Sequence, residues 1–387
     1  MRALFPVLLA LLVLCCGCGN NVHRPPRPGE PVRVGVYTGF GAAQSCQWEA
    51  YDALLLDSLV QPYYISAADI AQGILEQLHV VILPGGGGSS EYLSLGAGNR
   101  ARLQEFVKQG GGLVGICAGA YLLSQTPNYA CLALCPSQAI DIEHDHRGRG
   151  VAAYALSTQG KKLFPEIATL PQLYIYYYEG PVYDTLARDE ALEDFATMLS
   201  DVHTEGEAPA NMTNNRPAIV GNAVGNGRII SCIAHPEATP GMQWMIPRMA
   251  RWAARAEMPL YPATIVEPNY FGRELLVTPE QLKLEADQRD LLLYGTPEQK
   301  LEALKWLKAL HSWEAKRWIQ GLLYDDSPAV RAYVAAYIAD IGYATYMPDL
   351  RAALANETDS LTQATIAKAI AQLSPQYRHI PKPLEGR

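Results

Sequence analysis

A cysteine between glycines is the residue of this chain best placed to do chemistry. The stretch 115–119 (GICAG) follows an apolar run at 113–114 and leads into an apolar, helix-like segment at 120–123. Glycines permit a tight turn from a strand into a helix, which would raise the side chain of Cys117 above the sheet. The helix N–H groups and dipole there favour a thiolate. The alternative is a structural cysteine buried after a glycine-rich turn.

A histidine and a glutamate, two residues apart, follow a second apolar run at 229–234. In an extended segment, residues two apart point to the same side, so His235 and Glu237 can face one pocket. Pro236 between them stiffens the spacing. A cysteine nucleophile needs a base, and the base needs an orienting carboxylate. The pattern predicts a catalytic triad of Cys117, His235 and Glu237, with a capped strand end as the alternative for His235.

Four segments resemble a known family. They are GICAGAY at 115–121, RGRG at 147–150, YYYEGP at 176–181 and HPE at 235–237. Over roughly residues 32–256 the chain resembles the class I glutamine amidotransferase-like superfamily and, within it, the biotin-protein ligase N-terminal-like domain. The resemblance implies a flavodoxin-like fold and a nucleophile, base and acid at the three residues of the predicted triad.

The resemblance also implies donors for an oxyanion. These would be the backbone N–H groups of Ala118 and of the glycine loop at 85–88, with Gly86 and Gly87 as the expected donors. Glutaminases of the superfamily often carry a glutamine four residues after the nucleophile, whereas here no glutamine follows until Gln125. A glutamine pocket is therefore not expected. Biotin ligation is not expected either, because nothing after residue 256 resembles a ligase catalytic domain.

Five residues are expected to contact the substrate. Arg147 and Arg149 could clamp a carboxylate, because a guanidinium matches its geometry, with a solvent-facing loop as the alternative. The resemblance places Tyr178 and Glu179 near the active-site face, where alternating tyrosines on an edge strand are the alternative. Tyr121, in the GICAGAY segment, completes the set.

No metal or cofactor is expected. The acidic and histidine residues of 141–146 (DIEHDH) lie in one polar segment, which we interpret as a solvated loop. Cys131 and Cys135 have no matching second pair, which makes a zinc site a weak interpretation. The loop at 85–88 lacks the Gly-Lys-Ser/Thr ending of a phosphate-binding loop.

The N-terminus resembles a bacterial lipoprotein signal. An apolar run at 4–14 follows Arg2 and is too short to span a bilayer. Cys18, after Gly17, is the expected lipidated residue, with Cys16 as the alternative. A plain signal peptide or a membrane stub remains a further possibility. We expect a signal peptide at 1–17 and a proline-rich tether at 18–31, with the protein exported across the cytoplasmic membrane and held by palmitate or a similar acyl anchor at the periplasmic face or cell envelope.

Export changes the expectation for the remaining cysteines, which are Cys46, Cys117, Cys131, Cys135 and Cys232. An odd number in an oxidising compartment suggests one free thiol and up to two disulfides. Cys117 is the natural free thiol, and Cys131 could pair with Cys135, or one of them with Cys46. The alternative is that all stay reduced.

Two kinds of pattern divide the rest of the chain. Up to residue 256, buried strands such as 32–37 and 79–83 alternate with amphipathic helices, which predicts a doubly wound parallel sheet with its site at the carboxyl ends of the strands. After an expected linker at 257–277, residues 278–375 read as helical pairs that resemble HEAT repeats, with an ordinary helical bundle as the alternative and a tail at 376–387.

Charge and organisation limit the function. With 31 basic and 39 acidic residues, the chain lacks the excess of positive charge typical of nucleic-acid binding. The favoured function is a membrane-anchored cysteine hydrolase acting on a small amide or peptide-like substrate, with a possible protein partner on the repeats. The alternative is a non-catalytic binding or scaffolding lipoprotein on the same fold.

Overall fold

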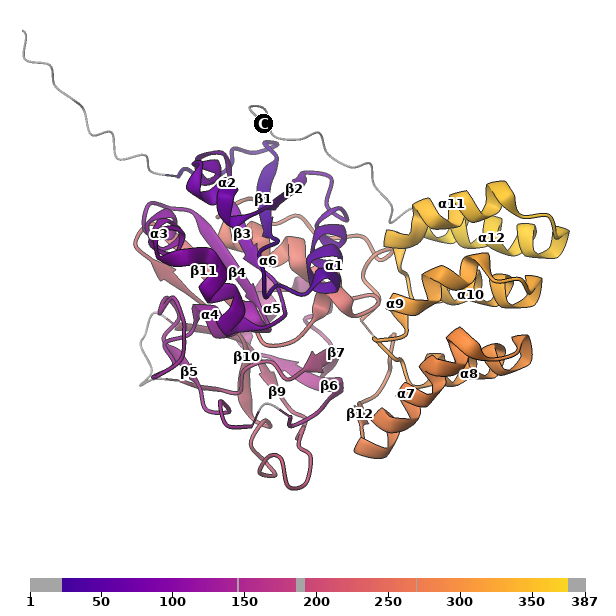
Figure 1. Ribbon diagram of the computed structural model, residues 1–387. Helices are drawn as coiled ribbons and strands as arrows, with labels where there is room; N and C mark the ends of the chain where they lie inside the picture. The colour runs from indigo at the N-terminus through magenta and orange to yellow at the C-terminus, as the bar shows by residue number, and fades with distance from the viewer. Residues whose placement is uncertain (1–22, 145, 186–191, 269, 375–387) are drawn as a thin grey trace, which may run out of the picture.

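The computed structural model describes residues 23–144, 146–185, 192–268 and 270–374. The expected signal peptide and Cys18 lie outside these residues. An α/β region and a stack of helices lie next to each other, the stack forming the orange and yellow part of Figure 1. Within the described ranges, no helix has the length and apolar character needed to cross a membrane.

Five parallel strands form one half of the main sheet. Their order is β2-β1-β3-β4-β11, and all four neighbouring pairs are parallel. The strands are β1 (Val32–Tyr37), β2 (Val60–Ile65), β3 (Val80–Leu83), β4 (Gly112–Ile116) and β11 (Gly227–Cys232). This is the flavodoxin-like order, with β11 as the fifth strand, so the predicted doubly wound fold is confirmed.

Antiparallel strands extend the sheet beyond β11 to ten strands. They are β10 (Arg216–Val224), β9 (Leu192–Met198), β6 (Arg149–Leu156), β7 (Leu173–Tyr178) and β12 (Leu275–Val277). A separate pair joins β5 (Ser137–Ala139) to β8 (Tyr183–Thr185). The expected linker at 257–277 is therefore partly sheet, because β12 pairs with β6.

Helices cover both faces of the parallel strands. One face packs against α1 (Gln44–Leu54) and α6 (Met245–Ala253), and the other against α3 (Gly88–Lys108) and α4 (Ala118–Leu123). The shorter elements are α2 (Ala67–Ala71), α5 (Thr158–Leu163), and the 3-10 turns η1 (Ile74–Gln77), η2 (Pro165–Ile167) and η3 (Pro236–Ala238). With both faces covered, strands such as β3 and β4 are apolar throughout.

The helical region has its own core. Its elements are α7 (Pro279–Tyr294), α8 (Pro297–Ala309), α9 (Lys316–Ile319), η4 (Gln320–Tyr324), α10 (Pro328–Asp340), η5 (Ala344–Tyr346), α11 (Met347–Asn356) and α12 (Ser360–Leu373). Threonines cap α7 and α8 with capping boxes, and proline stands in the first turn of both helices. These N-terminal capping signals explain why the sequence forms separate helices rather than one long helix.

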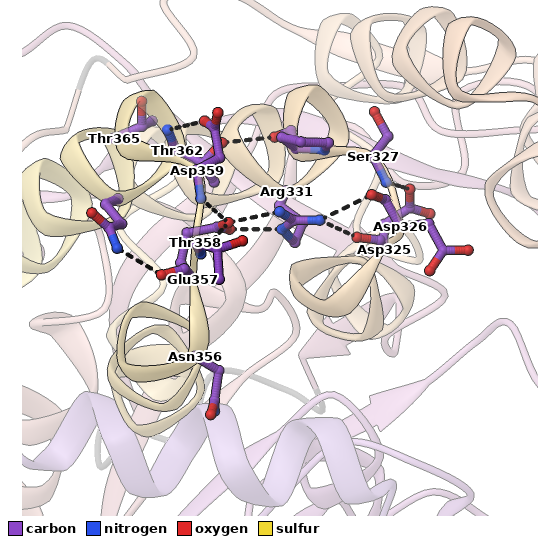
Figure 2. A network of polar contacts seen from close by, with 12 residues as sticks. Asp325, Asp326, Ser327, Arg331, Asn356, Glu357, Thr358, Asp359, Thr362 and Thr365 are labelled. Atoms are coloured by element: carbon purple, nitrogen blue, oxygen red, sulfur yellow. Dashed lines mark hydrogen bonds and ion pairs between the residues drawn. The ribbon is translucent and has the colours of Figure 1, made fainter.

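A polar network joins consecutive repeats (Figure 2). Arg331, on α10, donates two hydrogen bonds of 2.7 Å to the carboxylate of Glu357, and it also bonds the carbonyl oxygens of Asp325 and Asp326. Glu357 in turn accepts the N–H of Asp359, the residue that caps α12. One guanidinium thus fixes the loop before α10 against the loop before α12.

Candidate active site

Cys117 occupies a strained turn between β4 and α4. Its backbone has φ 52° and ψ −104°, a conformation that non-glycine residues rarely adopt and that is often found at functional sites. The flanking glycines are required. A Cβ on Gly115 would lie 2.4 Å from the carbonyl oxygen of Gly119, and one on Gly119 would lie 1.9 Å from that of Leu83. The sequence therefore produces the predicted turn, with the thiol 7% exposed.

His235 and Glu237 form a buried pair at the end of β11. The imidazole Nδ1 lies 2.8 Å from Oε1 of Glu237, and the backbone N–H of His235 donates to the carbonyl of Tyr176. The pair does not sit on an extended segment, as the sequence argument assumed. His235 leaves the strand at ψ 70°, and the 3-10 turn η3 brings the glutamate back to the ring. Burial alone would lower the pKa of His235, but the charges of Cys117 and Glu237 outweigh it and hold that pKa well above its ordinary value.

The thiol and the imidazole are close without a formed hydrogen bond. Cys117 Sγ donates to the carbonyl of Tyr178 at 3.5 Å, and His235 Nε2 has no hydrogen-bond partner among the described residues. The ring is nevertheless near enough for the charge of Cys117 to be the largest influence raising its pKa. Catalytic hydrogen bonds are often long or misaligned before substrate binds. The arrangement is that of a nucleophile, a base and an orienting carboxylate.

A cavity of about 730 Å³ opens onto Cys117 and His235. Predicted residues from four different parts of the chain line it. They are Gly86, Gly87, Cys117, Ala118, Tyr121, Tyr178, Glu179 and His235. The residues thus gather at the carboxyl ends of the strands, as the fold predicts.

Two backbone N–H groups are open to an oxyanion. Among the hydrogen bonds of the described residues, none uses the N–H of Ala118 or of Gly86. The prediction for Gly87 is wrong, because its N–H donates to the carbonyl of Gly41 at 2.8 Å. That bond helps to hold Gly86 in place, with φ +150°, where a Cβ would lie 2.0 Å from the oxygen of Gly41.

Arg147 does not face the cavity, and the prediction that it clamps substrate is wrong. Its guanidinium is fully buried and pairs with Asp141 at 2.8 Å. It also bonds the hydroxyl of Tyr177 and the carbonyl of Gly180. Two further bonds, to the hydroxyl of Tyr121 and the carbonyl of His144, occupy the remaining donors, so none is left for a substrate carboxylate. Asp141 is likewise not on a solvated loop, since it is fully buried and also accepts the hydroxyl of Tyr121.

Arg149 belongs to the junction between the two regions rather than to the substrate site. Its guanidinium pairs with Glu285, on α7, at 2.5 Å and lies 3.8 Å from Glu314. It also bonds the hydroxyl of Tyr178 at 2.8 Å, and it does not line the cavity. The prediction failed because the carboxylate that Arg149 binds comes from the helical region, 136 residues further along the chain.

Trp313 is a site residue that no sequence pattern indicated. It lies in the loop between α8 and α9, and it lines the cavity. Its ring centroid is 4.6 Å from that of His235, and it also contacts the rings of Tyr176 and Tyr178. The indole Nε1–H donates to both oxygens of Glu49, on α1, at 3.1 and 3.2 Å. The helical region thus supplies a wall of the site.

The five described cysteines are free thiols, as in the reduced alternative. Cys46 also lines the cavity near His235, but burial raises its pKa to about 11. Burial likewise raises the pKa of Cys135 and of Cys232 to about 12. Burial thus disfavours the thiolate at these three positions, none of which belongs to the predicted triad.

One set of described residues brings three metal-ligating atoms within 4.8 Å of one another. It consists of Cys46, His235 and Glu237. The same histidine and glutamate are already hydrogen-bonded to each other. A metal ion held there would compete with the bond that orients the imidazole.

Comparison with known families agrees with the two-part structure. Residues 32–132 match the family described as biotin-protein ligase, N terminal, and residues 295–374 match HEAT repeats. The α/β part therefore contains a segment similar to the biotin-protein ligase N-terminal family, and the helical part contains HEAT repeats. The first match contains Cys117 and the glycine loop but ends before His235. No curated protein matches the chain in sequence.

Several solved structures are similar to part of this chain. The glutaminase domain of Trypanosoma brucei CTPS with bound acivicin is 13% identical, with 60% of this chain and 97% of that chain covered and a TM-score of 0.39. A cytoplasmic protein from Salmonella typhimurium is 12% identical, with 57% and 98% covered and a TM-score of 0.38. The beta-galactosidase from Bacillus circulans sp. alkalophilus is 15% identical, with 59% of this chain but only 32% of that chain covered and a TM-score of 0.38. Similarity at this level carries no information about chemistry.

Proposed function

We propose that this protein is a cysteine hydrolase that cleaves an amide or related acyl bond. The observation that carries the proposal is Cys117 in its strained turn, beside a buried His235–Glu237 pair and the open N–H group of Ala118. The strain is maintained by the surrounding fold, and such strain is typical of functional residues.

The chemistry follows from these positions. Cys117 Sγ attacks the carbonyl carbon, His235 transfers a proton to the leaving amine, and Glu237 holds the imidazole in orientation. The N–H groups of Ala118 and Gly86 stabilise the oxyanion, each donor contributing on the order of 3 kcal/mol in comparable sites. Water then releases the acyl group from sulfur. The location of the substrate is proposed from the N-terminal sequence alone: the cell envelope, reached through a lipid on Cys18.

A second candidate is a binding protein without turnover. It is favoured by one observation, that Cys117 donates to the carbonyl of Tyr178 while His235 Nε2 has no partner among the described residues. In that case the cavity binds its ligand and the thiol remains inert.

The rate at which iodoacetamide alkylates Cys117 separates the two candidates. The full chain, in detergent, is labelled from pH 4 to 10 and each cysteine is followed by peptide mass spectrometry. If Cys117 and His235 form a catalytic pair, Cys117 is labelled fast at neutral pH, and its rate falls at least tenfold in His235→Ala. Cys46 serves as the internal control for a slow thiol. Labelling no faster than that of a free thiol, and unchanged by the substitution, would overturn the hydrolase and favour the binding protein.

A further inference from the structure

A second thiol lies in the candidate active site, and the proposed reaction does not use it. Cys46 stands in the first turn of α1, and Cys117 stands in the turn after β4. Both residues line the cavity of about 730 Å³, and both are buried free thiols. The cavity therefore connects two cysteines that lie far apart in the sequence.

Gly85 leaves the space on which these side chains converge. A Cβ on this glycine would lie 3.0 Å from Sγ of Cys46, 3.5 Å from Cβ of Cys117 and 2.8 Å from Cε1 of His235. The side chains come from α1, from the strained turn and from the end of β11. Because residue 85 has no side chain, the two cysteines can lie next to each other and next to the same imidazole.

His235 lies beside both thiols. Sγ of Cys46, a ring nitrogen of His235 and a carboxylate oxygen of Glu237 lie within 4.8 Å of one another. Burial lowers the pKa of His235, whereas Cys117, Glu237 and Cys46 all raise it. One imidazole is thus placed to accept a proton from either sulfur.

The two thiols differ in their readiness to react with an oxidant. Burial raises the pKa of Cys46 to about 11, so this residue is a thiol at neutral pH. Oxidants attack the thiolate, and a positively charged neighbour favours that form. Cys117 has such a neighbour when His235 is protonated. Oxidation is therefore expected to begin at Cys117 and to leave Cys46 beside it as an intact thiol.

We propose that Cys117 and Cys46 form an oxidation site that reacts with hydrogen peroxide and closes as a disulfide. The thiolate of Cys117 attacks a peroxide oxygen, the O–O bond breaks, and the sulfur becomes a sulfenic acid while hydroxide leaves and takes up the thiol proton as water. Cys46 then attacks that sulfur, and His235 passes its proton to the departing hydroxide. Two thiols are oxidised, one peroxide is reduced to two waters, and one S–S bond forms.

The disulfide would switch off the proposed hydrolase, because Cys117 then has no free sulfur with which to attack an acyl group. A dithiol reductant restores it by thiol–disulfide exchange. This consequence rests on the proposed function. Formation of the disulfide does not, since it requires neither a substrate nor turnover.

Peptide mapping of the peroxide-treated protein tests the proposal. The reduced full chain, in detergent, receives a small excess of hydrogen peroxide and is digested without reductant. We expect a linked pair of peptides that contains Cys46 and Cys117, and its loss on treatment with dithiothreitol. Sulfinic acid at Cys117 with Cys46 still a free thiol, or a disulfide from either residue to a different cysteine, would overturn the proposal.

Two cysteine variants isolate the role of Cys46. Cys46→Ser keeps the size of the side chain but removes the resolving sulfur, so Cys117 should accumulate at least tenfold more sulfinic acid than in the wild-type protein. The matched control is Cys131→Ser, because Cys131 is a free thiol that does not line the cavity. It should form the disulfide as the wild-type protein does. Equal amounts of sulfinic acid in Cys46→Ser and the wild-type protein would exclude Cys46 as the resolving cysteine.

The linked peptide of the wild-type protein decides the question even if Cys46→Ser does not fold. The hydrolase is read separately, from the effect of His235→Ala on the alkylation of reduced Cys117. If that substitution leaves alkylation unchanged while peroxide still links Cys46 to Cys117, the hydrolase fails and the oxidation site stands. Fast, His235-dependent alkylation without the linked peptide gives the opposite result.

Discussion

The two regions contribute to the site in different ways. In the α/β domain, Cys117 and His235 stand at the ends of neighbouring strands, where backbone geometry fixes their positions. In the HEAT region, Trp313 stands in a loop, and its position depends on packing against the other region. The proposed catalytic residues thus stand on the sheet, whereas the wall that encloses them depends on an interface. The comparison suggests that the α/β domain carries the reactive groups and the repeats determine access to them.

The largest loss of stability is expected from substituting Glu49, which lies where the two regions meet. Its carboxylate accepts from Trp313 and from Tyr343 and lies opposite Lys316, with all these groups largely buried. Glu49→Ala would remove the carboxylate paired with the buried Lys316 and leave only the more distant Glu237, and breaking a buried pair in this way costs about 3–5 kcal/mol. Urea unfolding followed by circular dichroism should show that loss.

The matched control removes an exposed ion pair from the same region. Glu302→Ala breaks the exposed pair with Lys305 on α8, which should leave the free energy of unfolding nearly unchanged. If Glu49→Ala were no more destabilising than this control, the junction would not hold the regions together, and the contrast drawn above would fail.

The next effect concerns the acid of the triad. Glu237→Gln keeps the shape of the side chain but removes the charge that orients His235 and that, together with Cys117, raises its pKa. We expect the alkylation rate of Cys117 at pH 7 to fall about a hundredfold, equivalent to about 2.7 kcal/mol. Thermal unfolding of the same sample shows whether the fold is retained. A rate within threefold of the wild-type rate would exclude Glu237 as the orienting acid.

A smaller effect is expected at Trp313, and it tests whether the repeats take part in the site. Trp313→Ala removes the ring that packs on His235, while Trp313→Phe keeps a ring but loses the hydrogen bonds to Glu49. We expect the alkylation rate of Cys117 to change about tenfold in the alanine variant and less in the phenylalanine variant. The pH at which the rate is half-maximal should also shift.

Trp318 provides the control for this pair, because it lies in the same region but is 41% exposed. Trp318→Ala should leave both the rate and the pH profile unchanged. An unchanged pH profile in Trp313→Ala would mean that Trp313 only stabilises the interface. The site would then consist of residues of the α/β domain alone.

The same contrast explains what the sequence could predict. The turn at Cys117 was predictable because only glycines fit beside it. Alternating apolar strands and helices predicted the parallel half of the sheet, but not the antiparallel strands beyond β11. The arginines were wrongly assigned because the sequence does not show which carboxylate each one meets. Arg147 meets a buried Asp141, and Arg149 meets Glu285 from the other region. Trp313 carries no local signal at all, since a lone tryptophan among helices usually belongs to a core.

The smallest effect is expected far from the site, within the repeats. Arg331 lowers the pKa of Glu357 to about 2, with help from the backbone N–H groups of Thr358 and Asp359 (Figure 2). Because the pKa is lower in the folded state, the ionised carboxylate stabilises the fold above about pH 4.5, and this contribution is lost as the pH falls toward 2. Glu357→Gln should therefore cost about 1 kcal/mol at pH 7 and progressively less in acid, measured by urea unfolding at a series of pH values. Since the network lies wholly among the repeats, the alkylation rate of Cys117 should not change. A change in that rate would mean that the stacking of the repeats, and not Trp313 alone, sets the geometry of the site.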